Sequence, residues 1–204
     1  MKTRERILHK SLELFNGLGE PNVTTLLISD ELDISPGNLY YHFKSKSEIL
    51  NELFGWYEKE MLGLLDVPES PMDIEDQWFF LHLIFESIAR YQFIYRDVVN
   101  VLEHYEKVHN RFQKIIAKKQ HATLQVLNNL KADHRLNANE SEIQALSDNI
   151  VLTATFWVSY TLIRDQEVDE NTLSRGVYQV MSQVVPYLEG EQRDMLMALK
   201  AAYL

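Results

Sequence analysis

The feature that most constrains this chain is how seldom its helical periodicity is interrupted. The sequence holds only 7 Gly and 5 Pro in 204 residues, and most of them lie at the ends of long stretches whose apolar residues recur at helical spacing. No segment keeps the period-two alternation that is typical of a half-buried strand. We therefore predict an all-α protein with about nine to ten helices.

Composition narrows the class of protein. Hydrophobic residues make up 46% of the chain and charged residues 25%, which is typical of a globular protein and excludes a disordered one. The absence of Cys excludes a disulfide scaffold, a thiolate zinc site and a cysteine nucleophile. No apolar run is long enough to predict a membrane span, and the charged N-terminus lacks the apolar core of a signal peptide, so we expect a cytoplasmic protein.

The first part of the chain shows the spacing of a helix-turn-helix. A short helix capped by Thr24 or Thr25 ends near Leu32. A tight turn follows, and Ser35 then caps a third helix that begins at Pro36, where the missing proline N–H is not needed. Two short helices around such a turn are typical of a DNA-binding motif. We expect the core of this head to consist of Leu12, Phe15, Ile28, Leu32, Ile34, Leu39, Phe43, Ile49 and Leu53.

The outer face of the third helix favours DNA as its partner. Leu39 and Phe43 lie four residues apart and therefore both face inward. The residues that remain outside are polar or aromatic and include no acid, whereas a solvated helix face normally carries Glu and Lys. Such side chains suit phosphates, base edges and thymine methyl groups. Singly, each aromatic residue is compatible with packing and each lysine with solvated surface, but the combination indicates DNA binding.

The distribution of charge supports this interpretation better than its sum does. A net charge of −10 at first disfavours nucleic acid as a partner. Residues 1–50 carry only −1 of that charge, and they contain two basic segments, residues 1–10 with +3 and residues 35–47 with +2. Ser45 and Glu48 form a capping box that opens a fourth helix, and Ser45 with Lys46 is a candidate phosphate clamp at that helix N-terminus.

A resemblance to a known family rests on two segments, Thr24-Thr25-x-x-Ile28 and Ile34-Ser-Pro-Gly-Asn-Leu-Tyr-Tyr-His-Phe-Lys-Ser-Lys46. Together they resemble the DNA-binding head of the tetracycline-repressor (TetR) family, over residues 4–54. The resemblance implies that this helix-turn-helix contacts the DNA backbone and base edges. With the outer face described above, the candidate DNA-contact residues are Thr25, Pro36, Gly37, Asn38, Tyr40, Tyr41, His42, Lys44 and Lys46.

Two positions depart from the family pattern. Asp33 stands where the family commonly has Gly in the turn, and Ser29 stands where it commonly has Ala. Asp tolerates the left-handed backbone conformation better than most residues, so we expect the turn to form. An acid close to DNA slightly weakens phosphate contact.

The remainder of the chain is predicted to be a larger helical body. We place a DNA-binding domain at residues 1–50 and an effector-binding and dimerisation domain at residues 51–204. The clearest break is Pro68-Glu-Ser-Pro71, which ends the fourth helix and begins the next at Ser70 or Pro71. Longer helices are predicted near residues 72–90, 94–104, 106–132, 140–164, 170–187 and 191–203.

Two late helices predict a dimer surface. Residues 150–163 are apolar on nearly every side, and a helix of that kind needs cover all round. The next helix carries an apolar stripe from Leu173 to Leu188. The resemblance implies that such helices pair two subunits, so we expect a homodimer through residues 143–188 that binds a palindromic DNA operator. The alternative is that this pair of helices forms only the core of one subunit.

The aromatic-rich middle of the chain predicts a pocket. Each aromatic residue there is singly compatible with core packing, but together they can line an apolar site, and the resemblance implies a small effector in this region. We expect an apolar or aromatic effector. The candidate pocket residues are Trp78, His82, Phe85, Glu86, Phe93, Asn100, Glu103, His104 and Phe156.

Two further patterns in the body have simpler interpretations. His82 and Glu86 share a helix face, but two ligands do not make a metal site, so we expect a structural pair and no metal. Basic residues from Lys107 to Lys119 recur at helical spacing. They form either a second nucleic-acid surface or, as we expect, a solvated helix face.

These observations predict a ligand-responsive, DNA-binding transcriptional regulator that acts as a repressor. The alternative is a helix-turn-helix regulator or adaptor that is controlled by a protein partner. The sequence has no Gly-rich phosphate loop, no H-E-x-x-H or G-x-S-x-G motif and no cluster of metal ligands. We therefore expect neither an enzyme nor a bound cofactor.

Overall fold

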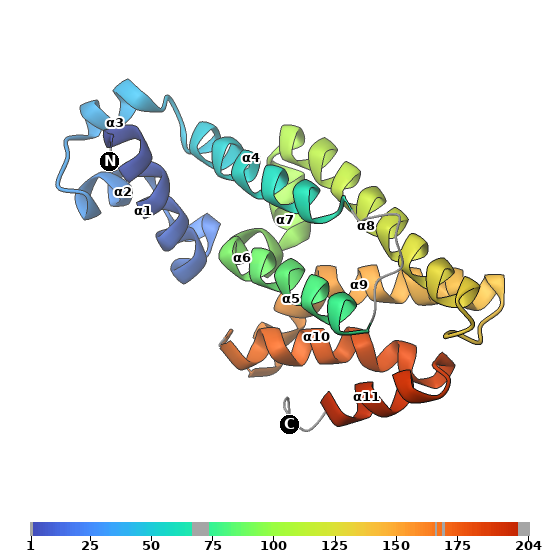
Figure 1. Cartoon of the computed structure of the whole chain (residues 1–204). Helices are drawn as coiled ribbons and strands as arrows, with labels where there is room; N and C mark the ends of the chain where they lie inside the picture. The colour runs from blue at the N-terminus through green and yellow to red at the C-terminus, as the bar shows by residue number, and fades with distance from the viewer. Residues whose placement is uncertain (1, 67–73, 166, 169, 200–204) are drawn as a thin grey trace.

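The computed structural model describes residues 2–66, 74–165, 167–168 and 170–199. Within them every regular element is a helix, which confirms the all-α prediction, and the one β feature is an isolated bridge between Leu136 and Leu188. The elements are α1 (Thr3–Leu18), η1 (Glu20–Asn22), α2 (Thr25–Glu31), α3 (Pro36–His42), α4 (Lys46–Leu64), α5 (Ile74–Arg90), α6 (Gln92–Arg96), α7 (Val98–His104), α8 (Glu106–Ala132), α9 (Glu140–Asp165), α10 (Glu170–Val184), η2 (Val185–Tyr187) and α11 (Glu191–Leu199) (Figure 1).

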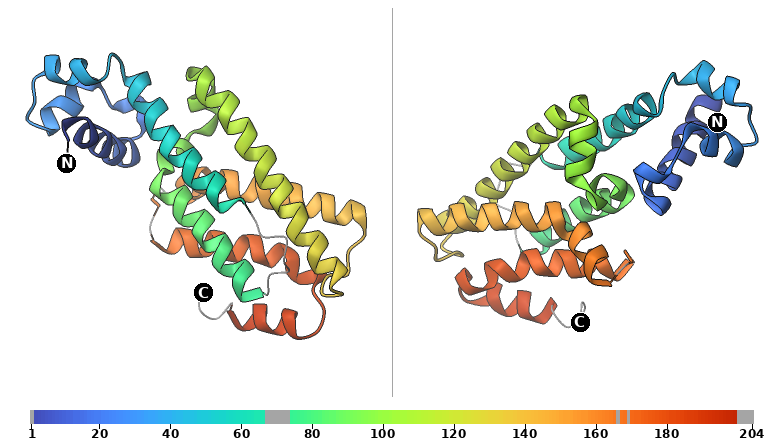
Figure 2. Two further views of the ribbon diagram at one scale, coloured as in Figure 1. Left: turned by 45° about the horizontal axis from the view of Figure 1, so that its top comes forward. Right: turned by 180° about the vertical axis from the view of Figure 1, so that it is seen from behind.

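The helices form a small head and a larger body. Helices α1 to α3 lie together at one end of the molecule, and α11 lies at the other (Figure 2). Helix α4 leads from the head into the body and packs on α5 and α8. The long helices α8 and α9 pack on each other, and α10 packs between α9 and α5. Each described helix is too short or too polar to span a lipid bilayer.

Side-chain caps define where the head helices begin. The Oγ1 of Thr24 accepts the N–H of Leu27 at 3.1 Å and starts α2. The Oγ of Ser35 accepts the N–H of Asn38 at 3.2 Å and starts α3. These contacts confirm two of the predicted N-caps, and each satisfies a helix N–H that has no partner within the helix.

The turn between α2 and α3 has the predicted left-handed residue. Asp33 has a φ of 53°, and it links two short helices whose inner side chains are buried. Ser29, the other departure from the family pattern, is buried and donates its hydroxyl to the Thr25 carbonyl at 2.7 Å. Both departures are therefore accommodated without loss of the motif.

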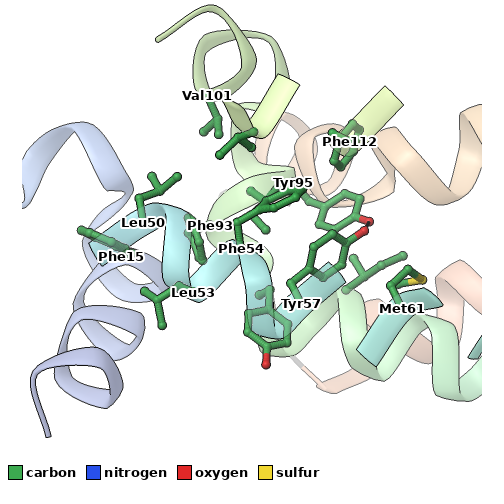
Figure 3. Close-up of a cluster of buried hydrophobic side chains, with 14 of the residues drawn as sticks. Phe15, Leu50, Leu53, Phe54, Tyr57, Met61, Phe93, Tyr95, Val101 and Phe112 are labelled. Atoms are coloured by element: carbon green, nitrogen blue, oxygen red, sulfur yellow. Dashed lines mark hydrogen bonds between the residues drawn. The ribbon is translucent and has the colours of Figure 1, made fainter. Parts of the chain in front are cut away.

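One hydrophobic cluster extends from the head into the body. Phe15 of α1 packs on Phe93 of α6 with ring centroids 5.4 Å apart. From there the cluster continues along Leu53 and Tyr57 of α4 to Phe112 of α8 (Figure 3). All nine predicted head-core residues belong to this cluster or pack against it. The expected domain boundary after residue 50 lies inside α4, so the two expected domains share a helix and a core.

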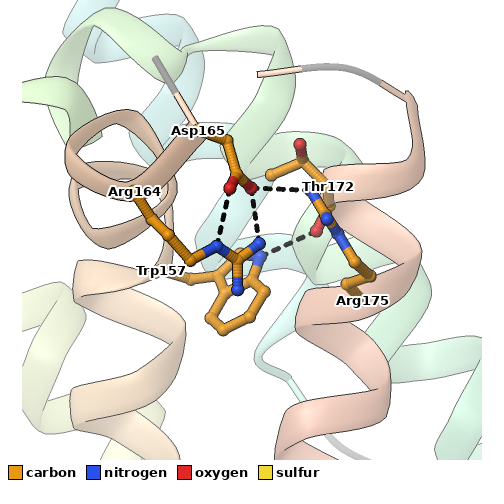
Figure 4. A network of polar contacts seen from close by, with 5 residues as sticks. All are labelled: Trp157, Arg164, Asp165, Thr172 and Arg175. Atoms are coloured by element: carbon orange, nitrogen blue, oxygen red, sulfur yellow. Dashed lines mark hydrogen bonds and ion pairs between the residues drawn. The ribbon is translucent and has the colours of Figure 1, made fainter. Parts of the chain in front are cut away.

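A second cluster joins α5, α9 and α10. Gly176 allows α10 to pack closely against Phe85 of α5 and Trp157 of α9. A Cβ at this position would lie 2.3 Å from Cε1 of Phe85 and 2.7 Å from Cδ1 of Trp157. The indole Nε1 of Trp157 donates to the Thr172 carbonyl at 2.7 Å. Arg175 of α10 donates to Asp165, which ends α9, at 3.2 Å (Figure 4). These contacts fix α10 against the end of α9.

Some helix boundaries differ from the predictions. The stretch predicted as one helix at 94–104 is two, α6 and α7, because Asp97 leaves the helical backbone with φ −148° and ψ 65°. The helix predicted to reach 187 ends at Val184 and continues as η2, which contains Pro186. The predicted break at Pro68-Glu-Ser-Pro71 lies outside the described residues, as does the last part of the helix predicted at 191–203.

Candidate functional site

The outer face of α3 is open to solvent. Its inner residues Leu39 and Phe43 are buried, whereas Tyr40 is 45% exposed and Tyr41 78% exposed. Pro36, Gly37, Asn38 and Lys44 are also exposed, and Thr25, His42 and Lys46 are partly exposed. The structure therefore places all nine candidate DNA-contact residues at the surface of the head.

Hydrogen bonds bring several of these residues together. The hydroxyls of Thr25 and Tyr40 lie 3.0 Å apart, which links the start of α2 to the middle of α3. The Nζ of Lys44 donates to the carbonyl of Tyr40 at 2.9 Å. The ring of Tyr41 meets His42 edge-on, with centroids 5.1 Å apart. The side chains of Thr25, Tyr40 and Lys44 are thus linked to one another within the head.

The predicted capping box at the start of α4 takes a variant form. The N–H of Glu48 donates to Oγ of Ser45 at 3.3 Å, as expected. The Glu48 carboxylate, however, accepts the N–H of Lys44 at 2.7 Å, one residue before the cap. Helix α4 is thus tied directly to the end of α3.

Lys46 is held by an acidic residue that the sequence analysis did not single out. Its Nζ lies 2.7 Å from Oε1 of Glu20 and donates to the Glu20 carbonyl at 3.1 Å. Glu20 is 4% exposed. Its Oε1 also accepts a hydrogen bond from the hydroxyl of Tyr105, which lies between α7 and α8. Burial, followed by the contact with Glu20, raises the pKa of Tyr105 and keeps its hydroxyl a donor.

The first basic segment of the head is partly neutralised. Arg4 pairs with Glu52 of α4, and its guanidinium lies over the ring of Phe43, 4.5 Å from the centroid. Lys10 pairs with Glu13 at 2.8 Å. Arg4 therefore holds α1 against α4, whereas the pair of Lys10 and Glu13 lies within α1.

An apolar cavity of about 610 Å³ opens between α7, α8 and α9. Apolar side chains dominate its walls, and a few polar groups lie among them. The hydroxyl of Thr155 is buried and has no hydrogen-bond partner, whereas Gln120 donates to Asp148 at 2.5 Å. The residues that line the cavity are Val98, Val99, Leu102, Phe112, Gln113, Ile116, Gln120, Asp148, Val151, Leu152, Thr155 and Phe156.

Most of the predicted pocket residues lie outside this cavity. Of the nine, Phe156 alone lines this cavity. Phe85 and Phe93 are buried in the two hydrophobic clusters, and Glu103 and His104 on α7 point to solvent. The others are at least partly exposed, namely Trp78, His82, Glu86 and Asn100.

The ring of His82 stacks on Trp78 with centroids 5.2 Å apart. Its Nε2 lies 4.0 Å from the Glu86 carboxylate. The described residues contain no group of three or more His, Asp or Glu side chains placed to hold a metal ion.

Helix α9 presents an uncovered apolar stripe. Leu152, Phe156, Tyr160 and Ile163 recur along one side of the helix and are 57%, 41%, 51% and 84% exposed. The other sides of α9 pack on α8 and α10 within the same subunit. The predicted interface segment thus serves both as subunit core and as an exposed surface.

The basic side of α8 is not solvated throughout. Arg111 pairs with Glu58 at 2.6 Å, and Lys119 is 4% exposed, where its Nζ donates to the Tyr95 hydroxyl at 3.0 Å. The Tyr95 hydroxyl in turn meets that of Tyr57 (Figure 3). The expectation of a solvated face is therefore wrong for Lys119, because its ammonium is buried against Tyr95 of α6.

Comparison with known proteins identifies the class of this chain. Residues 7–53 match the family model "Bacterial regulatory proteins, tetR family", and residues 56–196 match the model "TetR: Bacterial transcriptional repressor". The tetracycline repressor protein class C of Escherichia coli is 32% identical over 94 residues, which are 46% of this chain. The match spans 41% of that repressor's own length.

Solved structures agree with the sequence matches. A TetR-family transcriptional regulator from Marinobacter aquaeolei is 36% identical, with a TM-score of 0.90 over 100% of this chain and 99% of that one. A transcriptional regulator from Aquifex aeolicus shares the fold, with 21% identity and a TM-score of 0.60 over 97% of this chain and 99% of that chain. The chain belongs to the TetR family of bacterial transcriptional repressors.

Proposed function

We propose that this chain represses transcription by binding a palindromic DNA operator as a homodimer, and that a small apolar or aromatic effector releases it. The observation that carries the proposal is the exposed face of α3, where Tyr40, Tyr41 and Asn38 stand clear of the core. Because chromosomal DNA is its target, we place its action in the cytoplasm.

The α3 face suits the major groove. The helix begins with Pro36 and Gly37, which add little bulk, so its N-terminal end can approach base edges closely. Asn38 offers both a donor and an acceptor to base edges. Thr25 and Lys44 flank the face from α2 and from the end of α3, where they suit backbone phosphates.

The stripe on α9 supports a homodimer. An exposed row of large apolar side chains on a single helix suits a second copy of the chain, and Tyr160 and Ile163 are the members of that row that do not also line the cavity. A two-fold axis brings the same stripe of both subunits together. The two heads then present two copies of α3 to the two halves of a palindrome.

The cavity between α7, α8 and α9 is the proposed effector site, and it includes Phe156 from the predicted set of residues. Its volume of about 610 Å³ is in the range of small-molecule sites. Its apolar walls suit an apolar body. A cavity of this kind favours a small molecule over a protein partner as the controlling ligand.

DNA binding is tested with the full chain and a random duplex library. The selected duplexes should be palindromic, and Tyr41→Ala together with Asn38→Ala should weaken binding to them by at least about tenfold in fluorescence anisotropy. Phe79→Ala is the matched control, because Phe79 is an exposed aromatic residue of the body. Unchanged affinity of the α3 variant, or selection of no duplex, contradicts the proposed function.

A further inference from the structure

We propose that Glu20 is a positioning residue for DNA binding, which ties Lys46 of the head to Tyr105 of the body and so carries the state of the effector cavity to the DNA-binding surface. The inference rests on the proposed function and adds a route by which it is regulated. It concerns three elements that are distant in sequence, η1, the start of α4 and the junction of α7 with α8.

The first half of the link is the hold of Glu20 on Lys46. The ammonium of Lys46 meets two acceptors of the same residue, Oε1 at 2.7 Å and the backbone carbonyl at 3.1 Å. The side chain of Lys46 keeps 27% of its surface exposed. An ammonium has three N–H donors, so two are fixed by Glu20 and the third remains for a phosphate. Glu20 thereby sets where the charge of Lys46 is presented.

The second half of the link is the contact of Glu20 with the body. Tyr105 is both the C-cap of α7 and the N-cap of α8, and its hydroxyl donates to the same Oε1 that meets Lys46. Helix α7 supplies Val98, Val99 and Leu102 to the wall of the cavity. Leu102 lies one helical turn before Tyr105. A ligand in the cavity that displaces α7 therefore also shifts the Tyr105 hydroxyl, which donates a hydrogen bond to Glu20.

Burial makes this link sensitive to the loss of either contact. The Glu20 side chain is 5% exposed, and Lys46 is its one ion-pair partner in the described part of the chain. A buried carboxylate that loses a donor is left with an unsatisfied charge, which is costly. The positions of Tyr105 and Lys46 are coupled because both satisfy one oxygen.

Three further polar contacts between head and body, in the part of the chain that the structure describes, centre on Asn16, which is not a candidate DNA residue. Asn16 of α1 accepts the N–H of Phe93 at 3.0 Å and donates to the Arg90 carbonyl at 2.9 Å. Arg96 donates to the Asn16 carbonyl at 2.9 Å. These contacts dock α1 on the body, whereas Glu20 joins the body to a side chain of the proposed DNA surface.

A double-mutant cycle on DNA affinity tests the link. Anisotropy with the duplex selected by the full chain compares wild type, Tyr105→Phe, Lys46→Gln and the double variant. Tyr105→Phe removes a single hydroxyl and should weaken binding about 3- to 10-fold, the range of one net hydrogen bond. In the Lys46→Gln background the same change should have no further effect, because its route to DNA has been removed.

If Tyr105→Phe weakens DNA affinity equally in the wild-type and the Lys46→Gln chains, the proposed link is overturned, whereas the proposal that the chain binds DNA stands. A wild-type chain that binds no duplex overturns the proposed function and this inference together. Tyr178→Phe is the matched control, since it removes a tyrosine hydroxyl from α10 without touching the link.

Glu20→Gln provides a second route to the same result should Tyr105→Phe prove unstable. It keeps the shape of the side chain but removes the ion pair. It should weaken binding in the wild-type background and have no effect in the Lys46→Gln background. An undiminished effect in the Lys46→Gln background overturns the link.

Discussion

The ammonium of Lys119 lies 3.0 Å from the hydroxyl of Tyr95 in the core of the body, and no ion-pair partner accompanies it in the described part of the chain. Burial lowers the pKa of Lys119 from 10.5 to about 7. Burial also raises the pKa of Tyr57 and of Tyr95, so both hydroxyls stay neutral through that range. A buried base of this kind makes stability depend on pH.

We predict that stability rises as the pH increases from about 7 towards 10.5. In that window the unfolded chain binds a proton at Lys119 that the folded chain does not, so the free energy of unfolding increases by at most about 1.4 kcal/mol per pH unit. Below a pH of about 7, Lys119 is protonated in both the folded and the unfolded chain, so the full free-energy cost of burying its charge remains. Lys119→Met should therefore stabilise the protein most below pH 7 and least near pH 10.

Urea unfolding at several pH values measures this difference. Lys114→Met is the matched control, because Lys114 is an exposed lysine of the same helix. If Lys119→Met changes the free energy of unfolding by the same amount at every pH between about 6 and 10, this would falsify the lowered pKa of Lys119.

We predict that Gly176→Ala destabilises the protein by about 1–3 kcal/mol, even though alanine favours helices. The new methyl group would lie 2.3 Å from Phe85 and 2.7 Å from Trp157, so α5, α9 and α10 would have to separate. Gly63→Ala is the control, since a Cβ at that position of α4 meets no described atom within 4 Å beyond its chain neighbours and the backbone of its own helix. It should be neutral or stabilising by up to about 1 kcal/mol. Thermal unfolding of both variants decides, and equal melting temperatures would contradict the packing argument.

We predict that Ile163→Glu weakens the homodimer at least about tenfold. Ile163 is 84% exposed on the apolar stripe of α9, so the change is harmless to a lone subunit but buries a carboxylate between two of them. Sedimentation over a series of concentrations should show a dimer dissociation constant that is raised at least about tenfold, while Phe79→Glu on α5 should leave that constant unchanged. A dimer that is unaffected by Ile163→Glu would place the interface elsewhere.

We predict that Asp33→Gly stabilises the head by up to about 1 kcal/mol, because glycine adopts a positive φ at no steric cost. Asp33 has a φ of 53° in the turn before α3. The variant also removes an acid close to the proposed DNA surface, so its affinity for the selected duplex should rise slightly. Asp33→Ala tests the reason, since alanine lacks both the charge and the tolerance for this backbone. If the melting temperature of Asp33→Ala matches that of Asp33→Gly, backbone strain is not the cause.

Local signals in the sequence predicted the head well. Thr24, Ser35 and Pro36 act through hydrogen bonds and backbone geometry within a few residues, so their roles can be inferred without the tertiary structure. The same holds for Asp33. The limits of α8 were also predictable, because its long amphipathic pattern runs without a break from 106 to 132.

The cavity between α7, α8 and α9 and the contacts of Glu20 could not be predicted in this way. A cavity depends on how α7, α8 and α9 cross, and an apolar residue such as Phe93 looks the same in sequence whether it lines a cavity or fills the core. Glu20 lies in a connector that has no periodic pattern. Its two side-chain partners, Lys46 and Tyr105, are 26 and 85 residues away. The burial of Lys119 could not be inferred either, because a lysine on a helix with many basic residues is normally solvated.

The hydrophobic cluster that runs from Phe15 to Phe112 has a consequence for anyone who builds hybrid regulators from this chain. A head that shares its core with the body cannot be exchanged as an independent cassette at residue 50, because the cut leaves Leu53 and Phe93 facing foreign side chains. A hybrid that folds correctly would have to include α4 and the α6 residues that contact the head, as well as α3. New DNA specificity is therefore more readily obtained by changing the exposed residues of α3 alone.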